Sequence, residues 1–99
     1  MQDSATEKIR NVISRPGMFL LEDDLSYAVA FLSGLDYSSD TKPLNGFHDW
    51  IVDKYFNEPQ AQAWEHLIKK IPQCAKNNPK SDVQAFLMIV DEYLNTIEV

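Results

Sequence analysis

The chain has 99 residues, 44% hydrophobic and 24% charged, which suits a single domain with one apolar core. Its net charge of −6 disfavours binding to nucleic acid or to an anionic membrane, because both carry phosphate. A single cysteine, Cys74, excludes an internal disulfide and a dithiol metal site. The polar beginning and the shortness of every apolar run predict a cytoplasmic protein without a signal peptide or membrane span.

The first helix is expected over residues 4–14, where apolar residues recur at helical spacing. Ser4 followed by Glu7 has the spacing of a capping box. The pattern stops at Arg15, because the residue before a proline leaves the helical region and Pro16 is followed by a glycine.

Met18 and Phe19 open a short apolar segment that is predicted to be a loop buried under the helices. A second helix is expected from the N-cap residue Asp24 to about Tyr37. This helix is apolar nearly all round, which predicts either a central position or a face that meets a partner. Gly34 inside it indicates either a close helix crossing or a local break.

Three further helices are predicted from the same periodicity. The first covers residues 47–56, the second begins at Pro59 and ends before Pro72, and the third runs over 81–98 with Ser81 as its N-cap. No segment shows the alternation typical of strands. The sequence therefore predicts an all-α fold, a single compact bundle of about five helices formed by residues 1–99.

Acidic side chains are concentrated in the segment 22–53, which carries seven carboxylates against one lysine, Lys42. They belong to Glu22, Asp23, Asp24, Asp36, Asp40, Asp49 and Asp53. A field of one sign attracts a partner of opposite sign and speeds their encounter. The plainer interpretation is a solvated surface that like charge keeps soluble. The lysine-rich segment 69–80 would complement the acidic segment of a second copy, which makes a homodimer a further expectation.

Catalytic chemistry has little support in the sequence. His48 with Asp49 and Asp53 supplies half of a metal site or an acid–base pair, but no second histidine lies at metal spacing and a hydrated helix face is the better explanation. The pKa of the Cys74 thiol would fall beside Lys76, yet no positioned base accompanies it. We therefore expect no enzyme, no metal and no cofactor.

Several short motifs resemble those of small helical immunity proteins of bacterial polymorphic toxin systems, including contact-dependent growth inhibition. They are Arg15–Phe19 (R-P-G-M-aromatic), Phe31–Gly34, Gly46–Trp50 (G-F-x-x-W), Trp64 and the final helix Phe86–Leu94. The resemblance implies an antitoxin that binds and blocks a cognate toxin domain. Such toxins are often nucleases with basic clefts, so an acidic inhibitor would take the place of phosphates.

The partner-binding hypothesis names eight residues. The charge partners are Asp23, Asp24, Asp36, Asp40, Asp49 and Asp53, and the aromatic anchors are Tyr37 and Trp50. Trp50 also lies on the apolar stripe of its helix, where core packing is the competing role. Arg15 is expected to bridge to a carboxylate or to cap the first helix. The alternative function is a small dimeric regulatory module that binds a protein or a ligand without catalysis.

Overall fold

Six α-helices and two 3₁₀ turns make up the computed structural model, which describes residues 4–97. They are α1 (Ser4–Ser14), α2 (Pro16–Phe19), α3 (Leu25–Tyr37), α4 (Phe47–Tyr55), α5 (Trp64–Leu67), η1 (Ile68–Lys70), η2 (Pro72–Cys74) and α6 (Pro79–Ile97). Within residues 4–97 there is no strand, so the all-α prediction is confirmed.

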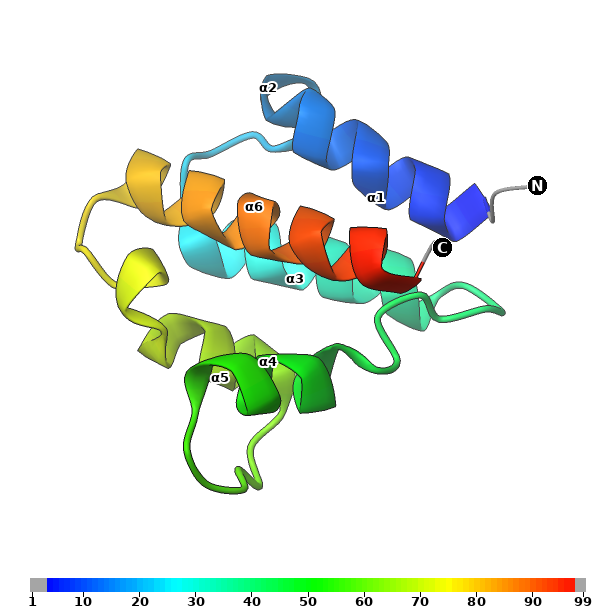
Figure 1. Cartoon of the computed structure of the whole chain (residues 1–99). Coiled ribbons are helices and arrows are strands. Elements are labelled where there is room, and N and C mark those ends of the chain that lie inside the picture. Colours follow the sequence, from blue (N-terminus) through cyan, green and yellow to red (C-terminus); the bar gives the residue numbers. More distant parts are fainter. Residues whose placement is uncertain (1–3, 98–99) are drawn as a thin grey trace.

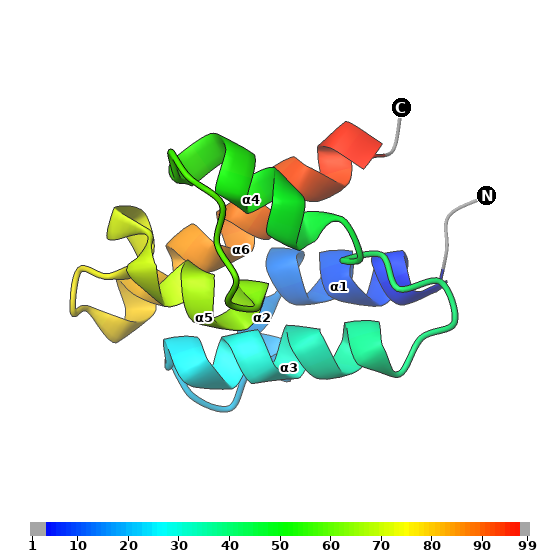
Figure 2. The ribbon, with the colours of Figure 1, turned by 90° about the horizontal axis from the view of Figure 1, so that it is seen from below.

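The last helix, α6, is the centre of the molecule. It packs against α1, α3 and η2, and Figures 1 and 2 show α4 and α3 on different sides of it. α1 and α3 run antiparallel beside each other, and the short α5 contacts both α3 and α4. Phe86, Val90 and Leu94 of α6 are fully buried, as the apolar stripe of this segment requires.

Local sequence signals explain where the first helices begin and end. α1 buries Ile9 and Val12 and ends at Ser14, because Arg15 adopts an extended φ of −138° before Pro16. The carboxylate of Asp24 accepts a hydrogen bond of 3.0 Å from the backbone N–H of Tyr27. This N-cap fixes the start of α3, as predicted.

An aromatic cluster joins α4, α5 and α6. Phe47 is fully buried, and its ring centroid lies 5.1 Å from Trp64 and 5.2 Å from Tyr93. A Cβ atom at Gly46 would lie only 2.8 Å from the Tyr93 hydroxyl. The lack of a side chain at Gly46 therefore leaves room for the Tyr93 ring. The predicted motif Gly46–Trp50 is therefore a packing motif in this fold.

Three details of the predicted helices were wrong. Residues 16–19 form the helical turn α2 instead of a loop, and Met18 is 69% exposed instead of buried. A Cβ atom at Gly34 would meet nothing within 4 Å, and α3 runs through this position, so neither a close crossing nor a break explains the glycine. The helix expected from Pro59 begins only at Trp64 and ends in 3₁₀ turns.

The last helix begins two residues before the predicted start. Asn78, not Ser81, caps it, because the Asn78 side-chain oxygen accepts a hydrogen bond from the Ser81 N–H at 3.1 Å. Asp82 is buried, and its carboxylate accepts a hydrogen bond of 3.0 Å from the N–H of Lys76. The predicted final residue of this last helix, Glu98, lies outside the described residues.

No helix within residues 4–97 is both long and apolar enough to cross a lipid bilayer.

Candidate protein-binding surface

The eight predicted partner-binding residues do not form one surface, because α3 and α4 lie on different sides of the molecule (Figure 2). The structure places them in three groups. Asp23 and Asp24 precede α3; Asp36, Tyr37 and Asp40 lie at its C-terminal end; Asp49, Trp50 and Asp53 belong to α4. Six of the seven carboxylates between residues 22 and 53 are exposed, and only Asp36 is half-buried.

The two carboxylates before α3, those of Asp23 and Asp24, differ in their hydrogen bonds. Asp24 caps α3 through the N–H of Tyr27, and it is nevertheless exposed to solvent. Its neighbour Asp23 is exposed as well, and no hydrogen bond of its side chain is formed within the part of the chain described. A carboxylate at this helix end is favoured by the helix dipole whether or not a partner binds.

The group at the end of α3 is held by hydrogen bonds within its own loop. The Oδ1 atom of Asp36 accepts a hydrogen bond of 2.7 Å from the N–H of Leu44, which fixes the loop that follows the helix. Tyr37 is 82% exposed, with the Lys42 ammonium 5.2 Å from the centre of its ring. Asp40 is exposed at the loop tip. Tyr37 and Asp40 are therefore available to a partner, whereas Asp36 has a structural role.

The group on α4 consists of two exposed carboxylates one helical turn apart and a packed tryptophan. Asp49 and Asp53 share the outer side of the helix, and the Asp49 side chain is 95% exposed. Trp50 is half-buried, and its ring packs against Phe47 and, edge to face at 5.6 Å, against Tyr93. Core packing is thus the role that the structure shows for Trp50.

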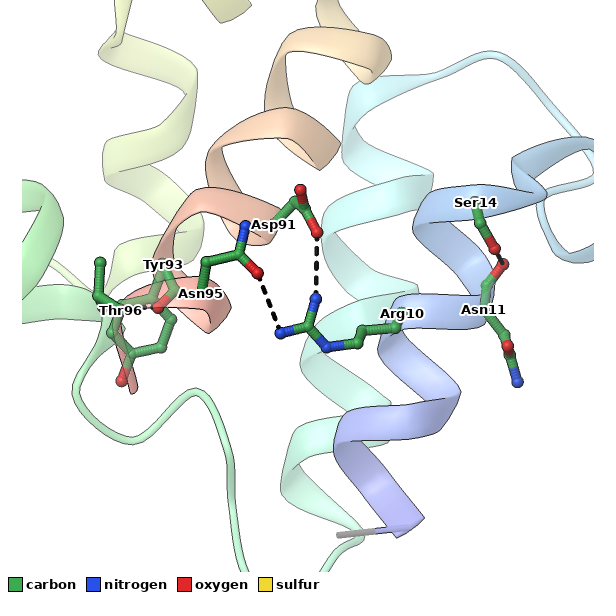
Figure 3. Close-up of polar contacts among 7 residues, drawn as sticks. All are labelled: Arg10, Asn11, Ser14, Asp91, Tyr93, Asn95 and Thr96. Carbon is green, nitrogen blue, oxygen red and sulfur yellow. Dashed lines mark hydrogen bonds and ion pairs between the residues drawn. The ribbon is translucent and has the colours of Figure 1, made fainter. Parts of the chain in front are cut away.

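Two acidic residues of α6, Asp91 and Glu92, differ from these groups because cations of the same chain pair with them. Arg10 of α1 donates hydrogen bonds to Asp91 Oδ1 at 3.3 Å and to Asn95 Oδ1 at 3.2 Å (Figure 3). Lys54 of α4 pairs with Glu92, and this hydrogen bond raises the pKa of the lysine. These bridges had no sequence signal beyond the spacing of Asp91 and Asn95 on one helix face.

By contrast, among residues 4–97 none of the seven carboxylates in the segment 22–53 pairs with a lysine or an arginine. Within the part of the chain described, the one basic side chain within ion-pair distance of any of them is that of His48, whose Nδ1 atom lies 3.1 Å from Asp49 Oδ1. The side chain of Arg15 also makes no ion pair with any described residue, so the predicted bridge from Arg15 is not formed within residues 4–97. The carboxylates without a cationic partner are therefore concentrated around α3 and α4, although Glu7, Glu58 and Glu65 also form no ion pair with a described residue.

His48 and Cys74, the residues considered for catalysis, are both held in packed surroundings. His48 is half-buried rather than hydrated, and its Nε2 atom lies 3.1 Å from the carbonyl oxygen of Gln60, which ties α4 to the next loop. Burial, and then the charge of Asp82, raises the pKa of the Cys74 thiol to about 11, which contradicts the expected lowering by Lys76. Within residues 4–97, no three His, Cys, Asp or Glu side chains gather closely enough to hold a metal ion.

No protein-family model, no curated protein and no solved structure matches this chain.

Proposed function

We propose that this protein is an immunity protein, which binds a basic bacterial toxin domain in the cytoplasm and neutralises it. The observation that carries the proposal is the uncompensated negative charge of the segment 22–53. Arg10 and Lys54 pair with Asp91 and Glu92 of α6, whereas the carboxylates around α3 and α4 have no lysine or arginine partner among residues 4–97. Unpaired like charges oppose folding slightly and favour association with a cationic surface.

A nuclease domain suits this surface best among toxins. Its cleft must attract phosphate and is therefore lined with lysine and arginine. An inhibitor that presents spaced carboxylates competes with the nucleic acid for the same cations. The field also speeds encounter, which matters for an inhibitor that must reach the toxin before the toxin reaches its substrate.

If the proposal holds, a toxin gene should lie directly beside the gene of this chain, and the test uses the toxin domain encoded there; the absence of such a gene would count against the proposal. Co-expression should protect cells from that domain, and the purified proteins should bind with an association rate that falls as salt is added. The charge-reversed pair Asp40→Lys and Asp53→Lys should weaken binding and protection together. Both residues are exposed and hold no described structural contact, so the melting temperature should change little.

The matched control reverses two exposed carboxylates outside the acidic segment, Glu7→Lys and Glu58→Lys. The control should keep most of the affinity and all of the protection. If both pairs bind and protect like the parent, the acidic segment is only a solvated surface. A parent protein that neither binds nor protects against the neighbouring toxin domain would overturn the proposed function itself.

A further inference from the structure

The loop between α4 and α5 is joined to the rest of the molecule by few hydrogen bonds. Residues 57–62 of this loop are in no helix, and all of them except Gln60 are exposed. Within residues 4–97, no backbone–backbone hydrogen bond involves them. Two side chains from other elements reach the loop, because His48 contacts the Gln60 carbonyl and Lys70 bonds to Gln62. A segment with so few contacts opens easily, and Figure 1 shows this loop projecting from the molecule beside α4.

Both ring nitrogens of His48 face oxygen atoms that can only accept a hydrogen bond. The Nδ1 atom lies 3.1 Å from Asp49 Oδ1, and the Nε2 atom lies 3.1 Å from the carbonyl oxygen of Gln60. A neutral imidazole has one N–H group, whereas the protonated ring has two. Turning the ring over would bring carbon atoms to both oxygens, so its orientation is well determined. Only the protonated ring therefore satisfies both contacts at once.

Asp49 is the charged group that competes with the loop for a proton of this ring. In the part of the chain described, it is the one carboxylate within ion-pair distance of His48. The other charged side chains on α4, the loop, α5 and the C-terminal half of α6 make no ion pair with the ring, and they are Asp53, Lys54, Glu58, Glu65, His66, Asp91 and Glu92.

We propose that His48 holds loop 57–62 against α4 in a pH-dependent way. The protonated ring donates to Asp49 and to the Gln60 carbonyl together, which fixes the loop. As the pH rises, the Nε2 proton passes to water and the Nδ1–H group stays on Asp49. The Nε2 lone pair then faces the carbonyl oxygen and repels it, so the loop leaves α4. Histidine is the side chain that ordinarily changes charge between about pH 5 and 8. This inference does not depend on the proposed function.

Two physical reasons favour Asp49 over Gln60 as the partner of the neutral ring. Asp49 is a charged acceptor, and charge-assisted hydrogen bonds are about twice as strong as neutral ones. His48 and Asp49 also belong to the same helix, so their contact orders only side chains, whereas the contact with Gln60 orders a loop. The surface beside α4 therefore has two shapes, one for each charge state of a single histidine.

The experiment follows the ring and the loop in one pH titration of the isotope-labelled protein by nuclear magnetic resonance. The ring nitrogens report the charge of His48 and, for the neutral ring, which nitrogen keeps the proton. The carbonyl carbon of Gln60 reports its hydrogen bond. Once His48 is neutral, its proton should be on Nδ1. The amide order parameters of the loop should fall from about 0.85 toward 0.6, with the same midpoint as the ring.

Asp49→Ala is the decisive variant, because it removes the competing acceptor and leaves His48 in place. Its neutral ring should keep the proton on Nε2, so the loop should stay ordered over the whole pH range. His48→Ala should leave the loop mobile at every pH. Two matched controls alter exposed residues and should respond to pH like the parent. Asp53→Ala makes the same change of charge on α4, and His66→Ala removes the other histidine.

Each part of the inference can be overturned separately. A neutral parent ring that carries its proton on Nε2 would show that Asp49 does not win the competition. Loop order that stays constant while His48 titrates would show that the ring does not hold the loop. The inference would also be wrong if the loop of Asp49→Ala loosened with pH as in the parent, or if His48 kept one charge from pH 5 to 8.

Discussion

The carboxylate of Asp36 accepts a hydrogen bond of 2.7 Å from the backbone N–H of Leu44, eight residues later in the chain. This bond anchors a loop whose Leu44 side chain is only 2% exposed, so the carboxylate supports the core. A carboxylate that was expected to meet a partner is therefore part of the fold. Hydrogen bonds to charged acceptors are among the stronger ones in proteins.

Replacing Asp36 by alanine should destabilise the protein. The Leu44 N–H would lose its acceptor, and we expect a loss of about 1–3 kcal/mol in the free energy of unfolding. Urea denaturation measures it. Asp40→Ala, in the same loop but exposed, is the control and should change stability by less than about 0.5 kcal/mol. Equal losses in the two variants would show that the Asp36 bond contributes nothing specific.

Gly46→Ala should destabilise the aromatic cluster because the added methyl would press on the Tyr93 hydroxyl. Overpacking of this kind costs about 1–3 kcal/mol. Tyr93→Phe removes the obstructing oxygen, so the double variant should recover part of the loss. Thermal melts of the parent, both single variants and the double variant give the coupling. Strictly additive effects would mean that the hydroxyl is not what excludes a side chain at Gly46.

Val90→Ala on α6 should lower the free energy of unfolding by about 1–3 kcal/mol, through lost burial and a cavity in the core. Val90 is fully buried, whereas Met88, two residues earlier on the same helix, is 71% exposed. Met88→Ala should therefore change the free energy of unfolding very little. Equal losses at the two positions would contradict the orientation of α6.

Cys74 should make stability depend on alkaline pH. Its pKa rises from an ordinary 9.0 to about 11 on folding, so the folded state keeps the proton that the unfolded state releases. This contribution to stability is complete below pH 9 and is lost as the pH rises toward 11. Cys74→Ala should flatten that part of the curve. Burial also raises the pKa values of Tyr55 and Tyr93. The loss of stability that these two tyrosines cause above pH 10 should therefore remain in the Cys74→Ala variant.

A thiol reagent provides a second measurement for Cys74. The buried and protonated thiol should react far more slowly in the native protein than in guanidinium chloride. A native thiol that reacts as fast as the unfolded one at neutral pH would contradict both the burial and the raised pKa.

The positions of α1 and α3 could be predicted because apolar residues at helical spacing meet a clear boundary signal in each segment, Pro16 after α1 and the N-cap Asp24 before α3. The helix expected from Pro59 shows where this reasoning fails. Ala61 lies on the predicted stripe but is exposed, and the chain becomes helical only at Trp64, where burial begins. Helical periodicity without a surface to pack against does not stabilise a helix in water.

The grouping of the acidic side chains in space could not be predicted, because the fold separates residues that are close together in the sequence. Asp23 and Asp53 belong to one acidic segment, yet Asp23 directly precedes α3 and Asp53 lies in α4, and these two helices lie on different sides of the molecule (Figure 2). The sequence also gave no sign that Asp36 would bind a backbone N–H eight residues away. Asp36 and Asp40 are the same residue type, and only the geometry of the loop shows which of them accepts a backbone hydrogen bond.

The bridge from Arg10 to Asp91 and Asn95 has a consequence for synthesis on the ribosome. It spans more than 80 residues, and the helix at its far end also packs against both α1 and α3. Because α1 and α3 bury their apolar residues partly against α6, we expect these helices to emerge with apolar side chains still open to water. We therefore expect the core to become stable only after α6 has left the exit tunnel.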